Sequence, residues 1–277
     1  MIKKSLTFAI ILLLSWSLFI RVNSFSLSQH QMQDNIISAE KFLFDIKNID
    51  NLIVGSSLSK RLETDSLTNF YNLSFNGLSI FDGLEILENK YRFPKNVFIE
   101  INVIVRDQNK NFNEIISSPI LNVLKRQFMI LRTDKQPLTY ARNLLKKSST
   151  NKDSNSENEI SYEIFQKLLL LQKESYSEKI DSVDMNKKFQ KLTYFVNLLE
   201  SNGVKVIFFE MPVNPELVEL RRASYLRNRI IKDFPDNNFI RLPDNINSYE
   251  TEDGIHLKNS EAKMYSEYFK KKVANIN

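Results

Sequence analysis

The sequence predicts an α/β fold, a doubly wound three-layer sandwich with a mostly parallel sheet of about five strands. Three observations predict it: short apolar runs, amphipathic segments at helical spacing between them, and Gly, Pro or Asn where these segments end. Strands that alternate with helices are joined by crossover connections, so neighbouring strands run parallel. A sheet of this kind binds its ligands at the carboxyl ends of the strands.

Short apolar runs indicate the strands. The first run ends at Gly55, and Pro212 stops the fourth. In chain order, the expected strands cover residues 51–55, 73–75, 97–105, 204–210 and 239–242. Runs of this length and composition are typical of strands buried on both faces of a parallel sheet.

Apolar residues at helical spacing indicate the helices of the regular alternation. One helix is closed by Asn202-Gly203, and Asn259 is a favourable N-cap for the last one. These helices are expected at residues 78–91, 187–201, 215–232 and 259–273. With the strands they define one expected domain at residues 49–277.

Residues 106–186 interrupt the alternation. They have helical spacing around 115–131 and 160–173, and a stretch rich in Ser, Asn and Lys at 148–158 is typical of an exposed loop. We interpret 106–186 as a helical and loop insertion into the domain, and the polar, amphipathic residues 25–48 as a spacer before it.

Residues 1–24 are typical of an export segment, with Lys3-Lys4 before an apolar run at residues 6–20. That run spans about 22 Å as a helix, short of a bilayer core of roughly 30 Å, which favours a signal peptide cleaved near Val22-Asn23-Ser24. Arg21, directly after the run, favours an uncleaved membrane anchor instead, so both interpretations stay open. In either case the remaining chain is expected outside the cytoplasm, because the basic amino terminus stays inside.

The composition excludes several kinds of site. The chain has no cysteine, which rules out disulfides, thiolate nucleophiles and zinc–thiolate centres. Its only histidines are His30 and His256, so a His-rich metal site is not expected, and neither is a cofactor. Acidic and basic residues are interspersed despite a net charge of +5, and no nucleic-acid-binding motif is present.

The segment Asp253-Gly254-Ile255-His256 is the sharpest chemical feature, in the expected loop between the last strand and the last helix. A serine hydroxyl needs a base to take its proton, and that base needs an acceptor on its other ring nitrogen. Asp253 can supply this acceptor to Nδ1 of His256 within one tight turn. A surface turn with an incidental histidine is the alternative, although His256 is the only histidine in the expected domain.

A candidate nucleophile lies in Gly55-Ser56-Ser57-Leu58, at the carboxyl end of the first strand. A serine there projects into the ligand crevice, with its own N–H available to an oxyanion. Capping of the following helix is the common alternative role of such a serine. We expect Ser56 to cap and Ser57 to react, with Ser59 as a less suitable nucleophile further along the chain.

The chain resembles the SGNH (GDSL-like) hydrolase family, whose sheet is flavodoxin-like. Gly55-Ser56-Ser57-Leu58 looks like the family's Gly-Asp-Ser-Leu block, and Asp253–His256 looks like its closing Asp-x-x-His block. The resemblance implies a Ser57–His256–Asp253 triad. It also implies an oxyanion hole made by the N–H groups of Ser57 and Gly77 and by the side-chain amide of Asn102. These blocks occur in the family's order, and the resemblance covers roughly residues 49–105 and 203–272.

Two blocks depart from the family pattern. Ser56 stands where the family has Asp, and Glu100-Ile101-Asn102-Val103 replaces Gly-x-Asn-Asp, which makes Asn102 the least secure of the implied residues. Altered blocks after an N-terminal anchor look more like the family's envelope acyl-transfer branch. That branch includes alginate O-acetylation proteins and the teichoic acid D-alanine transfer protein.

The resemblance therefore implies an exported or anchored serine acyl-ester enzyme in the periplasm or on the surface of a bacterial cell. It would act on a cell-envelope glycan as O-acyltransferase or esterase, with a membrane-bound O-acyltransferase as partner. A catalytically weak glycan-binding or scaffolding module is the alternative. Glu210 and Arg221 are candidates for lining the substrate site, although Glu210 can equally form a salt bridge and Arg221 a solvated helix face.

Overall fold

The computed structural model describes residues 2–22, 30–46, 48–64, 69–90, 92–137, 140 and 160–276. It divides the chain into two compact units, one of residues 1–46 and 111–157, the other of residues 47–110 and 158–277. The expected loop at 148–158 and part of the expected cleavage site, Asn23-Ser24, lie outside the described residues.

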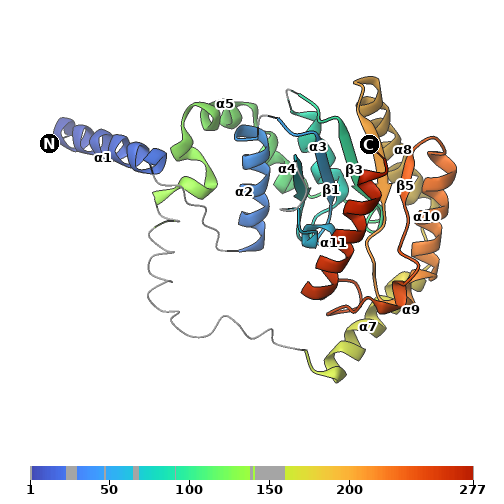
Figure 1. Ribbon diagram of the computed structural model, residues 1–277. Helices are drawn as coiled ribbons and strands as arrows, with labels where there is room; N and C mark the ends of the chain where they lie inside the picture. Colours follow the sequence, from blue (N-terminus) through green and yellow to red (C-terminus); the bar gives the residue numbers. More distant parts are fainter. Residues whose placement is uncertain are drawn as a thin grey trace. The chain divides into compact units, whose positions relative to one another are not determined.

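The second unit contains a five-stranded, all-parallel sheet in the order β2-β1-β3-β4-β5 (Figure 1). Its strands are β1 (Asn51–Gly55), β2 (Phe70–Ser74), β3 (Asn96–Glu100), β4 (Lys205–Phe209) and β5 (Asn238–Ile240). The order of strands reverses direction at β1: β2 is added on one side of β1, and β3, β4 and β5 follow on the other side. This reversal places the crevice of a doubly wound sheet beside the end of β1.

Helices connect the strands of this unit. They are α3 (Ile80–Glu88), α7 (Tyr162–Ser177), α8 (Ser182–Ser201), α9 (Pro215–Val218), α10 (Arg221–Asp233) and α11 (Asn259–Ala274), with short 3-10 turns η1 (Ser59–Arg61) and η4 (Ile246–Ser248). The segment after β1 is thus one 3-10 turn and not the start of an α-helix.

Helices cover both faces of the sheet. On one face, Phe269 of α11 contacts Phe98 and Phe209, with ring centroids 5.4 and 5.1 Å apart. On the other face α3 lies so close to β1 that a Cβ at Gly83 would approach Val54 Cγ1 to 2.8 Å. α8 contacts β4, and its Lys191 forms an ion pair with Glu85 of α3. The three-layer α/β sandwich expected from the sequence is therefore confirmed.

The first unit is helical. It contains α1 (Ile2–Val22), α2 (Gln31–Phe44), nearly all of α4 (Lys110–Ser117), α5 (Pro119–Gln127), η2 (Met129–Leu131) and η3 (Thr133–Lys135). Buried Glu40 of α2 joins these segments, because its carboxylate accepts from Lys125 Nζ at 2.7 Å and from the Thr133 N–H at 2.8 Å.

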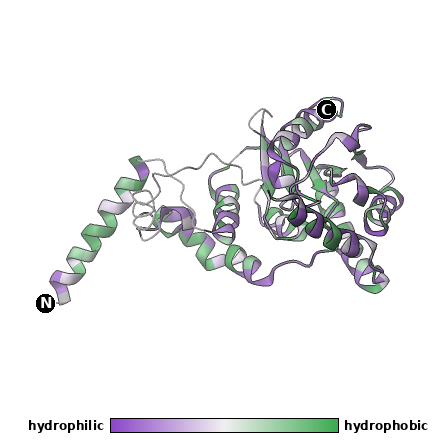
Figure 2. Ribbon diagram, turned by 90° about the horizontal axis from the view of Figure 1, so that it is seen from below, coloured by the Kyte–Doolittle hydropathy of each residue, from purple (hydrophilic) through white to green (hydrophobic). Residues whose placement is uncertain are grey.

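Helix α1 is long and apolar enough to cross a membrane between Lys3 and Val22. Figure 2 shows the apolar residues along it, and 6% of the most apolar window is buried. The assignment of α1 as a membrane-spanning helix rests on its length and composition. A signal sequence has the same two properties.

The structure differs from the sequence-based expectation in three segments. Residues 111–157 of the expected insertion group with the amino-terminal segment, whereas 158–186 belong with the sheet. The expected spacer 25–48 contains a packed helix, α2, with buried Ile37 and Phe42. β3 ends at Glu100, so Ile101 and the turn at residues 102–105 lie beyond the strand.

Candidate active site

Three loops meet at the carboxyl edge of the sheet, after the adjacent strands β2, β1 and β3. Strand register places Val54 beside Ile99, and Ser57 and Asn102 each follow three residues later. Gly55 pairs with Ser74, three residues before Gly77. The residues that the sequence selected for the nucleophile and the oxyanion hole therefore follow three neighbouring strands.

Ser57, His256 and Asp253 form a hydrogen-bonded line. His256 Nε2 lies 2.8 Å from Ser57 Oγ, and Nδ1 lies 2.7 Å from Asp253 Oδ2. An ionised carboxylate can only accept, so the Nδ1–H donates to Asp253 and Nε2 accepts from the serine hydroxyl. This is the arrangement that a serine nucleophile and its base require.

The loop that carries His256 is a small closed hairpin. Thr251 bridges Leu257, and the Glu252 N–H donates to the His256 carbonyl at 2.8 Å. Gly254 at its tip has φ +95°, a conformation that L side chains rarely adopt. The hairpin therefore fixes the separation of Asp253 and His256 by its own backbone bonds.

Asp253 is also a local anchor for the backbone. Its Oδ1 accepts the N–H groups of His256 at 2.8 Å and Ile255 at 3.1 Å, which leaves Oδ2 to face the imidazole. Burial raises the pKa of Asp253, but the hydrogen bonds from His256 and Ile255 outweigh it, and the net pKa lies below the usual value. The carboxylate is accordingly held ionised beside the imidazole.

Buried Glu100, the last residue of β3, holds the turn at Ser56–Ser59, which contains the candidate nucleophile Ser57 and is called the nucleophile turn below. Its carboxylate accepts from Ser56 N–H at 2.9 Å, Ser56 Oγ at 2.9 Å, Ser59 N–H at 3.1 Å and Ser59 Oγ at 2.5 Å. Ser56 and Ser59 are fully buried, whereas Ser57 between them is partly exposed. Two of the three nearby serines are thus occupied by Glu100, and Ser57 is the one that faces His256.

The close approach of Glu100 explains the glycine at the end of β1. A Cβ at Gly55 would lie 1.9 Å from Ser59 Oγ and 2.7 Å from Glu100 Oε2. Sequence reasoning treated Glu100 only as part of an altered block and missed this role. The signal was a charged residue that ends an otherwise apolar strand directly before Ile101-Asn102.

Arg61 links the nucleophile turn to the histidine hairpin. Its guanidinium donates to the Glu252 carboxylate at 2.6 Å and to the Leu257 carbonyl, the residues that flank Asp253 and His256. The hydrogen bond from Arg61 lowers the pKa of Glu252. Because Arg61 lies four residues after Ser57, one side chain sets the spacing of the two halves of the site.

Two backbone N–H groups are available to an oxyanion. Those of Ser57 and Gly77 have no acceptor within the part of the chain that the structure describes. The Asn102 side chain already has two hydrogen bonds within the protein. Its Nδ2 donates to the Met211 carbonyl at 2.9 Å, and its Oδ1 accepts from the Met211 N–H at 2.8 Å. One N–H of that amide remains, so the oxyanion role of Asn102 stays a prediction.

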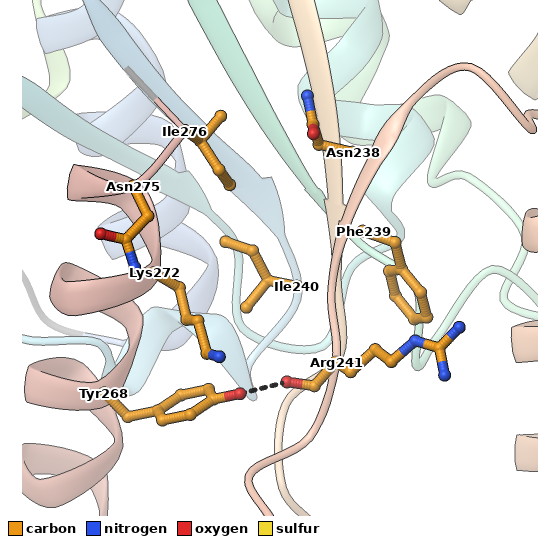
Figure 3. Close-up of a pocket in the computed structure, with 8 residues that line it drawn as sticks. All are labelled: Asn238, Phe239, Ile240, Arg241, Tyr268, Lys272, Asn275 and Ile276. Atoms are coloured by element: carbon orange, nitrogen blue, oxygen red, sulfur yellow. Dashed lines mark hydrogen bonds between the residues drawn. The ribbon is translucent and has the colours of Figure 1, made fainter.

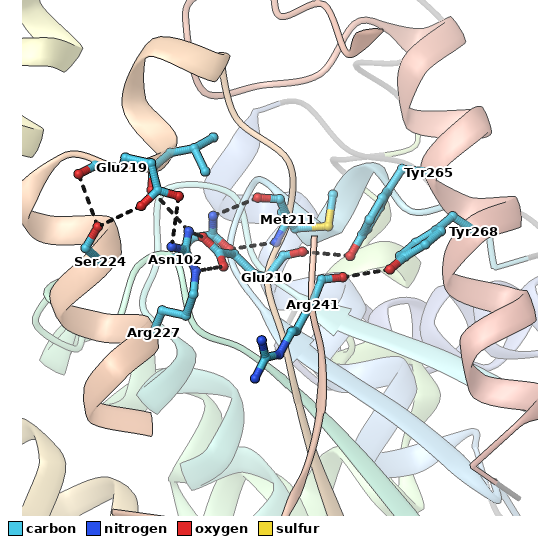
Figure 4. A network of polar contacts seen from close by, with 10 residues as sticks. Asn102, Glu210, Met211, Glu219, Ser224, Arg227, Arg241, Tyr265 and Tyr268 are labelled. Atoms are coloured by element: carbon cyan, nitrogen blue, oxygen red, sulfur yellow. Dashed lines mark hydrogen bonds and ion pairs between the residues drawn. The ribbon is translucent and has the colours of Figure 1, made fainter. Parts of the chain in front are cut away.

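Glu210 is a salt-bridged residue and does not line the site as a free carboxylate. Arg227 donates to its two oxygens at 2.9 and 3.0 Å, and Glu210 is 2% exposed (Figure 4). Burial raises the pKa of Glu210 more than Arg227 lowers it. The structure thus shows the salt-bridge alternative for Glu210, and its substrate-binding role stays a prediction. Arg221 is exposed on α10, and its role in substrate binding also stays a prediction.

A surface cavity lies elsewhere in the second unit. It has a volume of about 350 Å³ and opens between β5 and the end of α11, lined by Ile240, Arg241, Tyr268 and Lys272 among others (Figure 3). None of the three residues of the hydrogen-bonded line contributes to it. The site at Ser57 is therefore recognised by its hydrogen bonds and not by an enclosed volume.

No protein-family model matches the chain, and no curated protein is significantly similar to it.

Replacement of Glu100 by Gln should loosen the nucleophile turn. In the wild type the carboxylate accepts from four donors, whereas the –NH2 group of Gln would itself be a donor and would face some of them. We expect a loss of about 1.5–3 kcal/mol of unfolding free energy, measured by urea denaturation. The reaction of Ser57 with an acylating probe should slow as well. Glu178→Gln, on an exposed residue, is the control. Wild-type stability together with wild-type reactivity in Glu100→Gln would contradict this role.

The lowered pKa of Asp253 predicts a pH dependence of stability. A carboxyl whose folded pKa lies below its unfolded pKa stabilises the fold above the unfolded value of about 3.9, and loses that contribution as the pH falls through the folded value. The difference in unfolding free energy between the wild type and Asp253→Asn should therefore become smaller as the pH falls below 5. Urea denaturation of both proteins over this range tests it, and a difference that stays constant or widens would refute it.

Proposed function

We propose that this protein is an SGNH-type serine acyl-ester enzyme, with Ser57 as nucleophile, His256 as general base and Asp253 as its orienting carboxylate. The observation that carries the proposal is the pair of hydrogen bonds at His256, 2.8 Å to Ser57 Oγ and 2.7 Å to Asp253 Oδ2. The exposure of Ser57 beside two buried serines supports the choice of nucleophile.

In the first half of the reaction, Ser57 Oγ attacks the carbonyl carbon of an ester while His256 Nε2 takes the hydroxyl proton. The tetrahedral intermediate then collapses, and the imidazolium returns this proton to the departing alcohol. Asp253 stabilises the imidazolium between these steps, and the products are an acylated Ser57 and a free alcohol.

In the second half, a water molecule or a sugar hydroxyl attacks the acyl-serine, and His256 takes its proton. Collapse of this intermediate returns the proton to Ser57 Oγ and releases an acid or a new ester. Hydrolysis and transfer share the same residues and differ in the acceptor.

Negative charge develops on the former carbonyl oxygen in both halves. The N–H groups of Ser57 and Gly77 are the best-supported donors, because they have no acceptor within the described residues. One such donor is typically worth about 2.7–4 kcal/mol of barrier. We assign the remaining N–H of Asn102 as a third donor.

We further propose that the enzyme is anchored by α1 and acts outside the cytoplasm on a cell-envelope glycan, as O-acyltransferase or esterase. The length and apolar character of α1 support the anchor, and Lys3 and Lys4 before it favour an amino terminus on the cytoplasmic side. A membrane-bound O-acyltransferase would be the natural donor of acyl groups to such an enzyme.

Labelling with a fluorophosphonate tests the nucleophile and the base directly. We expect the wild type to be labelled and to hydrolyse p-nitrophenyl acetate, and both Ser57→Ala and His256→Ala to lose these reactions. Ser201→Ala and His30→Ala are matched controls. Ser201 is exposed, and His30 caps α2 outside the site, so both should react as the wild type does.

Labelling that persists in Ser57→Ala would overturn the nucleophile assignment. An unlabelled, folded wild type without esterase activity would favour a binding or scaffolding module in place of the enzyme.

A further inference from the structure

The length of α1 limits how deep in a lipid bilayer its carboxyl-terminal end can lie. A helix needs about 20 residues to cross a hydrocarbon core of roughly 30 Å, and α1 has 21. A crossing by α1 therefore uses almost the whole helix. At 1.5 Å per residue, Phe19 and Ile20 lie about 4.5 and 3 Å along the axis before Val22, near the edge of that core, and Trp16 lies deeper, about 9 Å before Val22.

The segment after α5 packs on these residues. The Trp16 indole N–H donates to the Lys135 carbonyl at 2.8 Å, and the rings of Trp16 and Phe19 lie 5.4 and 5.5 Å from that of Tyr140. Ile20 is 3% exposed, whereas residues 3–15 of α1 are exposed. Anything bound to this end of α1 shares its depth, so η2, Lys135 and Tyr140, which contact it, would lie close to the boundary between headgroups and acyl chains.

The neighbouring surface of α5 and η2 is apolar and exposed. Ile120 is 75% exposed, Val123 63% and Phe128 56%. The exposed apolar side chains of this surface are Ile120, Leu121, Val123, Leu124, Phe128 and Leu131. We call this set the apolar foot. A contiguous apolar surface of this kind marks a site of interaction.

The apolar foot is displayed by a fixed frame. Lys125, on the other side of α5, is buried against Glu40 at 2.7 Å. The Arg132 Nε–H donates to the Lys125 carbonyl at 3.1 Å, and its guanidinium pairs with Asp45. Lys125 and Arg132 thus point inward to α2 and its carboxyl-terminal cap, whereas the apolar side chains stay outside.

We propose that the apolar foot is a membrane-interface surface that inserts into the same lipid bilayer that α1 crosses. This inference rests on the anchoring by α1 in the proposed function. Trp and Tyr are typical of the interfacial level, and the rings of Trp16 and Tyr140 pack on each other at this end of α1. The foot and α1 then hold the first unit at the bilayer surface by two contacts, one that spans the bilayer and one that lies on it.

Nitroxide labels at single cysteines test this surface in the full chain, which contains no native cysteine. The variants Ile120→Cys and Val123→Cys probe the apolar foot. Arg126→Cys, an exposed residue on another side of α5, is the matched control, and Leu12→Cys reports the anchor itself. Each protein is placed in vesicles of phosphatidylcholine and phosphatidylglycerol, and label collisions with oxygen and with a nickel chelate are measured.

The ratio of oxygen to nickel collisions should be several-fold higher at Leu12, Ile120 and Val123 than at Arg126. A high ratio at Leu12 with water-like ratios at Ile120 and Val123 would overturn the apolar foot and retain the anchor. Water-like ratios at all four positions would overturn both. Protection of Ile120 and Val123 from both reagents would mean that protein covers the surface, and dipolar broadening would then identify a second copy of this chain.

Discussion

The buried carboxylate of Glu100 is the contact on which the geometry of the site depends. It ends β3 and accepts the backbone and hydroxyl groups of Ser56 and Ser59, so the turn after β1 is fixed from the neighbouring strand. A buried carboxylate is costly unless donors surround it, and this one has four. The same contacts that satisfy Glu100 leave Ser57 as the partly exposed hydroxyl of the turn.

The second half of the site is fixed in a comparable way. The hairpin around Gly254 closes on itself through Asp253 and the bridge between Thr251 and Leu257. Arg61 then ties this hairpin to the nucleophile turn. Each half is therefore held by its own hydrogen bonds, and Arg61 joins the halves beside the Ser57–His256 hydrogen bond, as preorganisation of the proposed site would require.

Much of this site could be predicted from sequence because its elements are local. Gly55 ends β1 and Ser57 lies in the turn that follows it, and the Asp253–His256 segment is a short hairpin before α11, so each can be recognised from a few consecutive residues. The contacts of Glu100, Arg61 and Asn102 could not be predicted, because they join strands and loops that are distant in sequence. Arg61 and Leu257, for example, are separated by 196 positions. The salt-bridge partner of Glu210 could not be named for a similar reason, since Arg227 lies on a different element.

The fold was predictable at the level of strand number and direction, because buried parallel strands have a distinctive apolar pattern. The division into two units was not, since it depends on which elements 111–157 contact and not on their own periodicity. β3 illustrates the limit: the apolar run continues to Val105, but the ladder stops at Glu100, beyond which the Asn102 side chain pairs with Met211.

The most direct measurement of the central claim is the capture of the acyl-enzyme. The chain would be mixed briefly with p-nitrophenyl acetate, quenched in acid and mapped by mass spectrometry of its peptides. We predict one acetyl group per chain, located on Ser57. Acetylation of another residue, or release of p-nitrophenol without acetylated Ser57 at any quench time, would contradict the assignment of Ser57, His256 and Asp253 as a nucleophilic triad.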